Sequence, residues 1–288
     1  MTDLFLAIFL SSLIFVIFKV FPRFKIDTFQ AIVFNYISAF LCGYILYGSD
    51  LKEEAWKNTN WIFYAVLAAL LFISLFVLMG KSAQKNGMAI TSVAVKMSMA
   101  VSVLGMVFIY NEQLPFLKII AILLAFSGVI LVSFSKKSSD SKQQTWWMLL
   151  ILFFGSGILD LLLNYVQKTQ VDVISTALFS AFGFGIAGLI GLGILIAQII
   201  RRRTRIEFRN VIGGVILGVP NFFSIFLLMR AYNSVTWSDS SVLAVINVAV
   251  VCISTLCGTL IFSEKISWAK GLGLCCSLLA IYLFYLVN

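Results

Sequence analysis

The stretch FIYNEQLPFLK, residues 108–118, returns later in the chain as LIFSEKISWAK, residues 260–270. Both copies place a glutamate, Glu112 or Glu264, at the end of a long apolar run and shortly before the next one. The chain has only 12 acidic residues among 288, yet two of them, both glutamates, occupy the same position between two apolar runs. This recurrence predicts that the chain consists of two related halves.

The composition is that of a protein embedded in a lipid bilayer. Hydrophobic residues make up 61% of the chain and charged residues 11%, and the mean hydropathy is +1.04. A soluble domain is typically about 25% charged and about 45–50% apolar. The apolar residues fall in runs of about 20, which is long enough to cross a hydrocarbon core of about 30 Å. The sequence therefore predicts an all-α polytopic membrane protein.

Ten apolar runs separated by short polar breaks predict ten transmembrane helices. The first run follows an acidic residue, so we interpret it as a span and not as a removable signal peptide. The longest polar loop between two expected spans, residues 48–60, is too short for a further domain. Glycines at residues 183–193 predict close packing of the seventh span against another helix. The expected spans are residues 3–21, 29–47, 60–80, 88–110, 114–135, 146–166, 174–200, 209–232, 240–262 and 267–287.

The distribution of Lys and Arg predicts how these spans are oriented. Loops after odd-numbered spans carry 15 of these residues, whereas the loops on the other side carry 5. Cytoplasmic loops of membrane proteins are enriched in Lys and Arg. We therefore expect odd-numbered loops in the cytoplasm and both termini outside it, in the inner (plasma) membrane of a bacterium. This bias accounts for the net charge of +9, so we expect no nucleic-acid partner.

An internal duplication explains the paired glutamates. A shift of 145 residues aligns FKIDTFQAIVFN, residues 24–35, with TQVDVISTALFS, residues 169–180. The shift grows to 152 residues at Glu112 and Glu264, as small insertions would produce. Each half has five spans, an odd number, so the second half must enter the membrane inverted. The expected organisation is a first repeat at residues 1–137, a connecting loop at 138–145 and an inverted repeat at 146–288.

Inverted repeats favour a transport function, because two similar halves can exchange conformations about a central site. The alternatives are a passive channel or facilitator and an intramembrane lipid-modifying enzyme. The chain has no histidine, which excludes an HExxH protease and histidine-ligated haem. Its five cysteines all fall in apolar spans, where free thiols act as small apolar side chains. We expect no enzymatic activity, no metal and no cofactor.

The chain resembles the EamA-type branch of the drug/metabolite transporter superfamily. The resemblance rests on two five-span halves in which YNEQL closes the fourth span and FSEKI closes the ninth. It covers nearly the whole chain and implies alternating access around a central cavity, lined mainly by spans 1, 3, 4, 6, 8 and 9. It also implies export of small polar metabolites such as amino acids. The chain departs from an exact repeat at Pro115, which has no counterpart after the second glutamate.

We interpret the two motif glutamates as structural residues. Glu112 precedes Pro115 and Glu264 precedes Ser267, where the next helix begins with unpaired N–H groups and the positive end of its dipole. A carboxylate is stabilised at such a position without any substrate. Glu112 and Glu264 therefore identify the fold, and we expect the substrate site elsewhere.

Charges inside the spans are the leading candidates for substrate contact. A charge at the bilayer centre costs about 2.5–3.5 kcal/mol or more, so such residues generally face protein or water. Lys96 lies about two turns into the fourth span, and Asp160 lies in the sixth. Neither has a charged counterpart in the other half. The alternative is an internal ion pair that only fixes helix packing, and either residue is also a candidate carrier of a coupling proton.

Uncharged polar residues extend this candidate site. Ser156, Asp160 and Asn164 are spaced by four residues and therefore share one helical face. Pro220 cannot donate a backbone hydrogen bond, which predicts a kink in the eighth span next to Asn221. The expected contacts of the small-molecule substrate within the lipid bilayer are Lys96, Asp160, Asn164, Ser156, Asn221 and Asn247.

Overall fold

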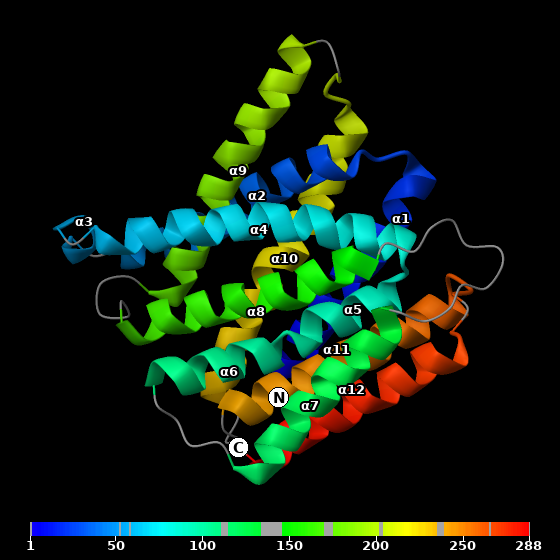
Figure 1. Ribbon diagram of the computed structural model, residues 1–288. Coiled ribbons are helices and arrows are strands. Elements are labelled where there is room, and N and C mark those ends of the chain that lie inside the picture. The colour runs from blue at the N-terminus through cyan, green and yellow to red at the C-terminus, as the bar shows by residue number, and fades with distance from the viewer. Residues whose placement is uncertain are drawn as a thin grey trace. The chain divides into compact units, whose positions relative to one another are not determined.

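The computed structural model describes a helical chain, and within the described residues it contains no β-strand (Figure 1). The described residues are 2–51, 53–57, 59–110, 115–133, 146–169, 175–201, 204–234, 239–264 and 266–287. The elements are α1 (Thr2–Val20), η1 (Phe21–Phe24), α2 (Thr28–Tyr47), η2 (Gly48–Asp50), α3 (Glu54–Lys57), α4 (Asn60–Lys85), α5 (Met88–Met97), α6 (Met99–Tyr110), α7 (Phe116–Ser133), α8 (Trp146–Thr169), α9 (Thr176–Ile200), α10 (Phe208–Ser234), α11 (Asp239–Leu260) and α12 (Trp268–Val287).

Every expected span contains a helix in the described part of the chain. Seven helical segments are long and apolar enough to cross a membrane: Thr2–Phe24, Thr28–Tyr47, Asn60–Lys85, Met88–Ile109, Trp146–Val166, Ala177–Ile200 and Phe208–Leu228. The other three expected spans hold shorter apolar helical stretches, Phe116–Leu131, Val245–Leu260 and Gly271–Leu283. The prediction of an all-helical, multi-pass membrane protein is confirmed.

The chain divides into two compact units, and neither coincides with one half of the sequence. Unit 1 comprises Met1–Lys19, Leu78–Leu161 and Leu227–Asn288, and unit 2 comprises Val20–Val77 and Leu162–Phe226. Each unit therefore combines segments from before and after the expected connecting loop. That loop, residues 138–145, lies outside the described residues.

In unit 1, α7 packs along α12 and α5 packs against α11 (Figure 1). Gly128 on α7 lies in close contact with α12. A Cβ atom there would overlap the Ser277 hydroxyl and lie 2.9 Å from the carbonyl oxygen of Gly273. Small residues permit such approaches between membrane helices, where dispersion contacts and hydrogen bonds drive association.

In unit 2, α2 packs against α9 through the glycines of residues 183–193, as the sequence predicted. A Cβ atom on Gly185 would lie 2.9 Å from the ring of Phe40, and one on Gly191 would lie 2.8 Å from Val33. The earlier glycine of α9, Gly185, meets the later residue of α2, Phe40, and the later glycine, Gly191, meets the earlier residue, Val33. The two helices are therefore antiparallel.

Local capping explains where these helices begin. The Asp27 carboxylate accepts a hydrogen bond from the Gln30 N–H at 2.8 Å and caps α2. The Ser175 hydroxyl accepts one from the Leu178 N–H at 3.4 Å and caps α9. Each cap satisfies a backbone donor that the first helical turn leaves unpaired. Gly87 precedes α5 with a φ of 101°, which glycine adopts readily.

One local feature was not predicted from the sequence. The polar loop 48–60 contains α3, where the Trp61 Nε1–H donates to the Ala55 carbonyl at 2.8 Å; four residues are too few to show a helical period. Pro220 lies inside α10, which continues on both sides of it. The kink expected at Pro220 stays a prediction.

Candidate functional site

The fourth span, a continuous helical segment from Met88 to Ile109, has a one-residue irregularity at Ser98, between α5 and α6. Ser98 keeps right-handed dihedral angles, φ −52° and ψ −21°, and its carbonyl accepts a hydrogen bond from the Val101 N–H at 2.9 Å. Its hydroxyl donates to the Val95 carbonyl at 2.6 Å. A serine that bonds to its own preceding turn competes with the backbone and bends the helix. The Ser98 carbonyl also accepts a hydrogen bond from the Ser102 N–H at 3.2 Å, so the turn is tightened without breaking the span.

This junction brings the two predicted intramembrane charges together in unit 1. Lys96 lies two residues before Ser98, and Asp160 lies on α8. The Ser98 hydroxyl oxygen is also 3.3 Å from the Asp160 Oδ2 atom, so its single proton is shared between this carboxylate and the nearer Val95 carbonyl. The Lys96 ammonium and the Asp160 carboxylate are close enough to attract each other. Ser98 therefore belongs to the candidate site, although sequence reasoning did not select it.

Gly157 allows α8 to approach the junction. A Cβ atom on Gly157 would lie 2.8 Å from the Ser98 carbonyl oxygen and 2.5 Å from the Cβ of Val101. The Ser98 oxygen is a backbone atom, which cannot move aside without shifting the helix. The missing side chain of Gly157 thus keeps Asp160, less than one turn later, within reach of Ser98.

The two charges are not sealed inside protein. Asp160 is exposed and Lys96 is half-buried. In the part of the chain that the structure describes, Lys19, Lys57 and Arg209 form ion pairs with glutamates, and Lys96 does not. An exposed carboxylate partway along an apolar helix is unfavourable against lipid. Asp160 therefore needs water or a polar ligand as its neighbour.

Two further predicted residues lie near the same junction. Ser156 is buried on α8, one turn before Asp160. Asn247 on α11 is 4% exposed, and its Nδ2 donates to the sulfur of Met99 at 3.7 Å. Met99 directly follows Ser98, so α11 contacts the junction from another side than α8. Unit 1 thus brings together Lys96, Asp160, Ser156 and Asn247.

The other two predicted polar residues belong to unit 2. The Oδ1 of Asn164 and the Nδ2 of Asn221 are buried and have no hydrogen-bond partner among the described residues. The same holds for both polar atoms of the Asn35 side chain, which is fully buried on α2 and was not selected from the sequence. A buried polar atom without a partner costs about 1–3 kcal/mol. These buried amides therefore have hydrogen-bonding capacity that no described residue satisfies.

Glu264 lies in a separate cluster within unit 1. Its Oε1 accepts a hydrogen bond from the Met88 N–H at 3.0 Å and lies 2.7 Å from the Nζ of Lys19. A Cβ atom on Gly87 would lie 2.7 Å from the other carboxylate oxygen. We expected Glu264 to act at the start of the next helix, α12, but these contacts reach α1 and the start of α5. Glu112 lies outside the described residues.

Comparisons with known proteins agree with this architecture. The model of the EamA-like transporter family matches residues 4–134. An uncharacterized protein of Haemophilus influenzae is 30% identical over 296 aligned residues, which cover 100% of this chain and 99% of that protein. A crystal structure of a protein with 10% identity aligns over 98% of this chain and 97% of its own, with a TM-score of 0.60, which shows a likeness of fold alone. With its spans and its glutamate motifs, the chain belongs to the EamA-like transporter family of the drug/metabolite transporter superfamily, whose members are membrane transporters of small molecules.

Proposed function

We propose that this protein is a secondary exporter of small zwitterionic metabolites such as amino acids, which bind between Lys96 and Asp160. The observation that carries the proposal is the tightened turn at Ser98, which places the Asp160 carboxylate next to the turn that holds Lys96. Ionisable residues inside a span mark candidate substrate or ion sites. The carboxylate of the substrate would pair with Lys96 and its ammonium with Asp160.

Charge balance favours a zwitterion over a ligand with a single charge. The Lys96 and Asp160 charges together sum to zero, and a zwitterion preserves that sum while giving each charge a partner. A purely anionic or cationic ligand would leave one charge uncompensated in an apolar setting, which is strongly unfavourable. Ser156 and Asn247 would add uncharged hydrogen bonds to the rest of the molecule.

Alternating access between two inverted repeats is supported by the positions at which helices cross. Three pairs of helices meet at residues whose separations match the shift of the sequence repeat. Helices related by a two-fold axis that passes between them cross at equivalent residues. The meeting residues are Phe40 and Gly185, 145 apart, Met99 and Asn247, 148 apart, and Gly128 and Ser277, 149 apart.

The directions of these helices also support the inversion. In unit 1, Asn247 contacts Met99, while a Cβ atom on Gly258 would lie 3.3 Å from Met88. Helices α5 and α11 are therefore antiparallel, as α2 and α9 are in unit 2. Equivalent helices of an inverted repeat have opposite directions in the membrane.

The composition of the compact units gives further support. In unit 1, the segments that begin at Leu78 and Leu227 are 149 residues apart. In unit 2, the segments that begin at Val20 and Leu162 are 142 residues apart. In both units, the paired segments begin at positions that are separated by nearly the repeat shift. This is expected if the ancestral repeat was divided between the two units at one position and both of its copies kept that position.

The zwitterion hypothesis is tested by thermal-shift binding of amino acids to the purified protein, repeated with the variants Lys96→Gln and Asp160→Asn. We expect each variant to lose binding of the zwitterion at least tenfold, the loss that corresponds to about 1.4 kcal/mol. Amines and carboxylic acids that carry only one of the two groups should bind the original protein more weakly. Lys57→Gln, at an exposed ion pair outside the site, is the control. Zwitterion binding that both site variants retain would refute the assignment.

Coupling to protons is tested in proteoliposomes that contain the purified protein. Substrate counterflow should accelerate when a proton gradient is imposed, and Asp160→Asn should abolish that response while retaining slow counterflow. A rate that ignores the gradient would indicate a passive facilitator instead of a coupled exporter. Undiminished coupling in Asp160→Asn would show that the proton binds elsewhere.

A further inference from the structure

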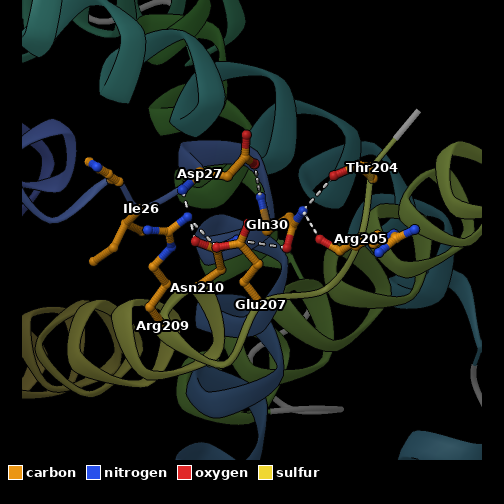
Figure 2. Close-up of a pocket in the computed structure, with 9 residues that line it drawn as sticks. Ile26, Asp27, Gln30, Thr204, Arg205, Glu207, Arg209 and Asn210 are labelled. Carbon is orange, nitrogen blue, oxygen red and sulfur yellow. Dashed lines mark hydrogen bonds and ion pairs between the residues drawn. The ribbon is translucent and has the colours of Figure 1, made fainter. Parts of the chain in front are cut away.

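A second polar site lies in unit 2, where α2 and α10 begin. It is a pocket of about 540 Å³ whose lining includes the basic residues Lys25, Arg205 and Arg209, the last two of which are labelled in Figure 2. None of these residues contributes to the proposed transport site. The pocket is open, and its charged side chains are exposed. Its geometry is therefore suited to a ligand that approaches from the membrane surface.

The floor of the pocket is a hydrogen-bonded pair of buried amides. Gln30 and Asn210 are each 2% exposed, and the Asn210 Nδ2 donates to the Gln30 Oε1 at 2.9 Å. The Gln30 Nε2 in turn donates to the Thr204 hydroxyl at 2.8 Å and to the Arg205 carbonyl at 3.0 Å (Figure 2). The Asn210 Oδ1 accepts from the Asp27 N–H at 2.9 Å. These bonds fix the segment before α10 to the first turn of α2, so the backbone of Arg205 is held in place.

The charges around the pocket are only partly compensated. Glu207 forms an ion pair with Arg209, and the Asp27 carboxylate is occupied as the cap of α2. Lys25 and Arg205 have no acidic partner among the described residues. The pocket therefore offers two available cations, one of them a guanidinium whose planar group suits two oxygens of a phosphate.

Apolar side chains next to the pocket indicate that its ligand has an apolar part. Phe24, Ile206 and Phe208 adjoin lining residues in the sequence and are 65%, 51% and 77% exposed. The apolar segments Thr28–Tyr47 and Phe208–Leu228 both begin here, which locates the pocket at the end of two membrane spans. Large apolar side chains at such a position contact lipid chains. The same place thus offers cations to a headgroup and apolar groups to acyl chains.

We propose that this pocket binds the phosphate headgroup of an anionic phospholipid. Lys25 and Arg205 contact the phosphate, and Phe24, Ile206 and Phe208 contact the acyl chains. Basic pockets next to membrane spans are suited to anionic lipids, whose charge is concentrated in the headgroup. The proposal does not depend on the transported substrate, so each can be refuted without the other.

The test uses the full-length protein in detergent and measures thermal stabilisation by short-chain phosphatidylglycerol and phosphatidylcholine at about 0.15 M salt, where distant surface charges are screened. We expect phosphatidylglycerol to bind more tightly than phosphatidylcholine. The double variant Lys25→Gln/Arg205→Gln should weaken phosphatidylglycerol binding roughly 25-fold, about fivefold for each cation. Arg201→Gln, which removes an exposed charge outside the pocket, should weaken it less than twofold.

Several outcomes would overturn the proposal. Equal losses in Arg201→Gln and the double variant would show diffuse attraction without a site. Equal binding of the two lipids would show no selectivity for an anionic headgroup, and protection by inorganic phosphate alone would identify a free-anion site instead. The Lys25 and Arg205 side chains are exposed, so the ligand-free variants should unfold at the temperature of the original protein. The single variants, measured separately, keep the test decisive if the double variant fails to fold.

Discussion

At the scale of single residues, Ser98 determines the geometry of the proposed substrate site. Its hydroxyl contacts Val95 in its own span and Asp160 on α8. Lys96 lies two residues before Ser98, and Met99, which contacts Asn247, directly follows it. The sequence identified the charges, because an ionisable residue in an apolar run is conspicuous. It could not identify Ser98, because the Asp160 carboxylate that its hydroxyl contacts is 62 residues away in the chain.

Replacing Ser98 with alanine should weaken substrate binding without unfolding the protein. The variant loses one hydrogen bond to the Asp160 carboxylate, a loss of about 1 kcal/mol or roughly fivefold in affinity. Alanine also has a higher helix propensity than serine, so the thermal midpoint should change little. Ser127→Ala, which removes an exposed hydroxyl bonded only to its own helix at Leu123, is the control for both measurements. An affinity equal to that of the original protein would exclude Ser98 from the site.

Replacing Glu264 with glutamine should destabilise the protein. The Lys19–Glu264 pair is 2.7 Å long with side chains 20% and 13% exposed, so its partners are largely withdrawn from water. Losing the charge leaves Lys19 without its carboxylate, at a cost of about 2 kcal/mol. Thermal unfolding in detergent measures this change.

Glu53→Gln is the matched control, because Glu53 and Lys57 are 90% and 75% exposed and 3.9 Å apart. Exposed pairs contribute little to stability, so its midpoint should equal that of the original protein. Equal midpoints for both variants would mean that the Glu264 cluster contributes no more than a surface pair.

At the scale of the helices, the apolar runs predicted the spans because their length alone must match the bilayer. The predicted start and end of each span differ from those of the helices by a few residues. Helix partners could not be predicted, since α2 contacts α9 through glycines whose neighbours are about 145 residues away. The tightened turn at Ser98 was also missed, because SVAVKMSMAV, residues 92–101, is compatible with a regular helix. The kink predicted at Pro220, inside α10, stays a prediction.

The contact of α8 with the α5–α6 junction should depend on Gly157. In Gly157→Ala, the new methyl group would meet the Ser98 carbonyl oxygen, a backbone atom, at 2.8 Å. The helices must separate, which should reduce stability by about 1–3 kcal/mol and weaken substrate binding. Thermal unfolding and substrate affinity measure the two effects.

Gly105→Ala is the matched control in the same unit. Its methyl group would meet the end of the Leu161 side chain, which can change rotamer, and alanine is favoured over glycine within a helix. Its stability and affinity should remain near those of the original protein. A Gly157→Ala variant that behaves like Gly105→Ala would show that the close approach is not required.

At the scale of the whole molecule, the sequence predicted the membrane class and the family. Fold recognition depended on two glutamate motifs at equivalent span ends, a long-range pattern that a single motif does not provide. The chain could not reveal that each compact unit combines segments from both halves, because that division depends on packing. For the same reason, the sequence could not show that Asn164 and Asn221 belong to unit 2 whereas Lys96 belongs to unit 1.

The orientation proposed for the chain rests on its basic loops, 15 Lys and Arg on one side against 5 on the other. Alkaline phosphatase fused after Val287 should be active, and green fluorescent protein at the same point should remain dark, because the C-terminus is expected outside the cytoplasm. Fusions after Arg201, in an expected cytoplasmic loop, should give the reverse result. Fluorescence at the C-terminus together with an inactive phosphatase would invert the expected topology.

The helix crossings have a consequence for how opposite charges came to share one site. Two identical subunits facing each other across a symmetry axis must place the same side chain on both sides of each crossing. Here Phe40 meets Gly185 and Met99 meets Asn247, so each crossing combines unlike partners. A single chain also needs only one Lys96 and one Asp160, whereas a dimer of identical halves would bury two of each. Under the proposal of two inverted repeats, fusion of the halves would permit a chemically asymmetric site on a nearly symmetric frame, with half the number of charges in the bilayer.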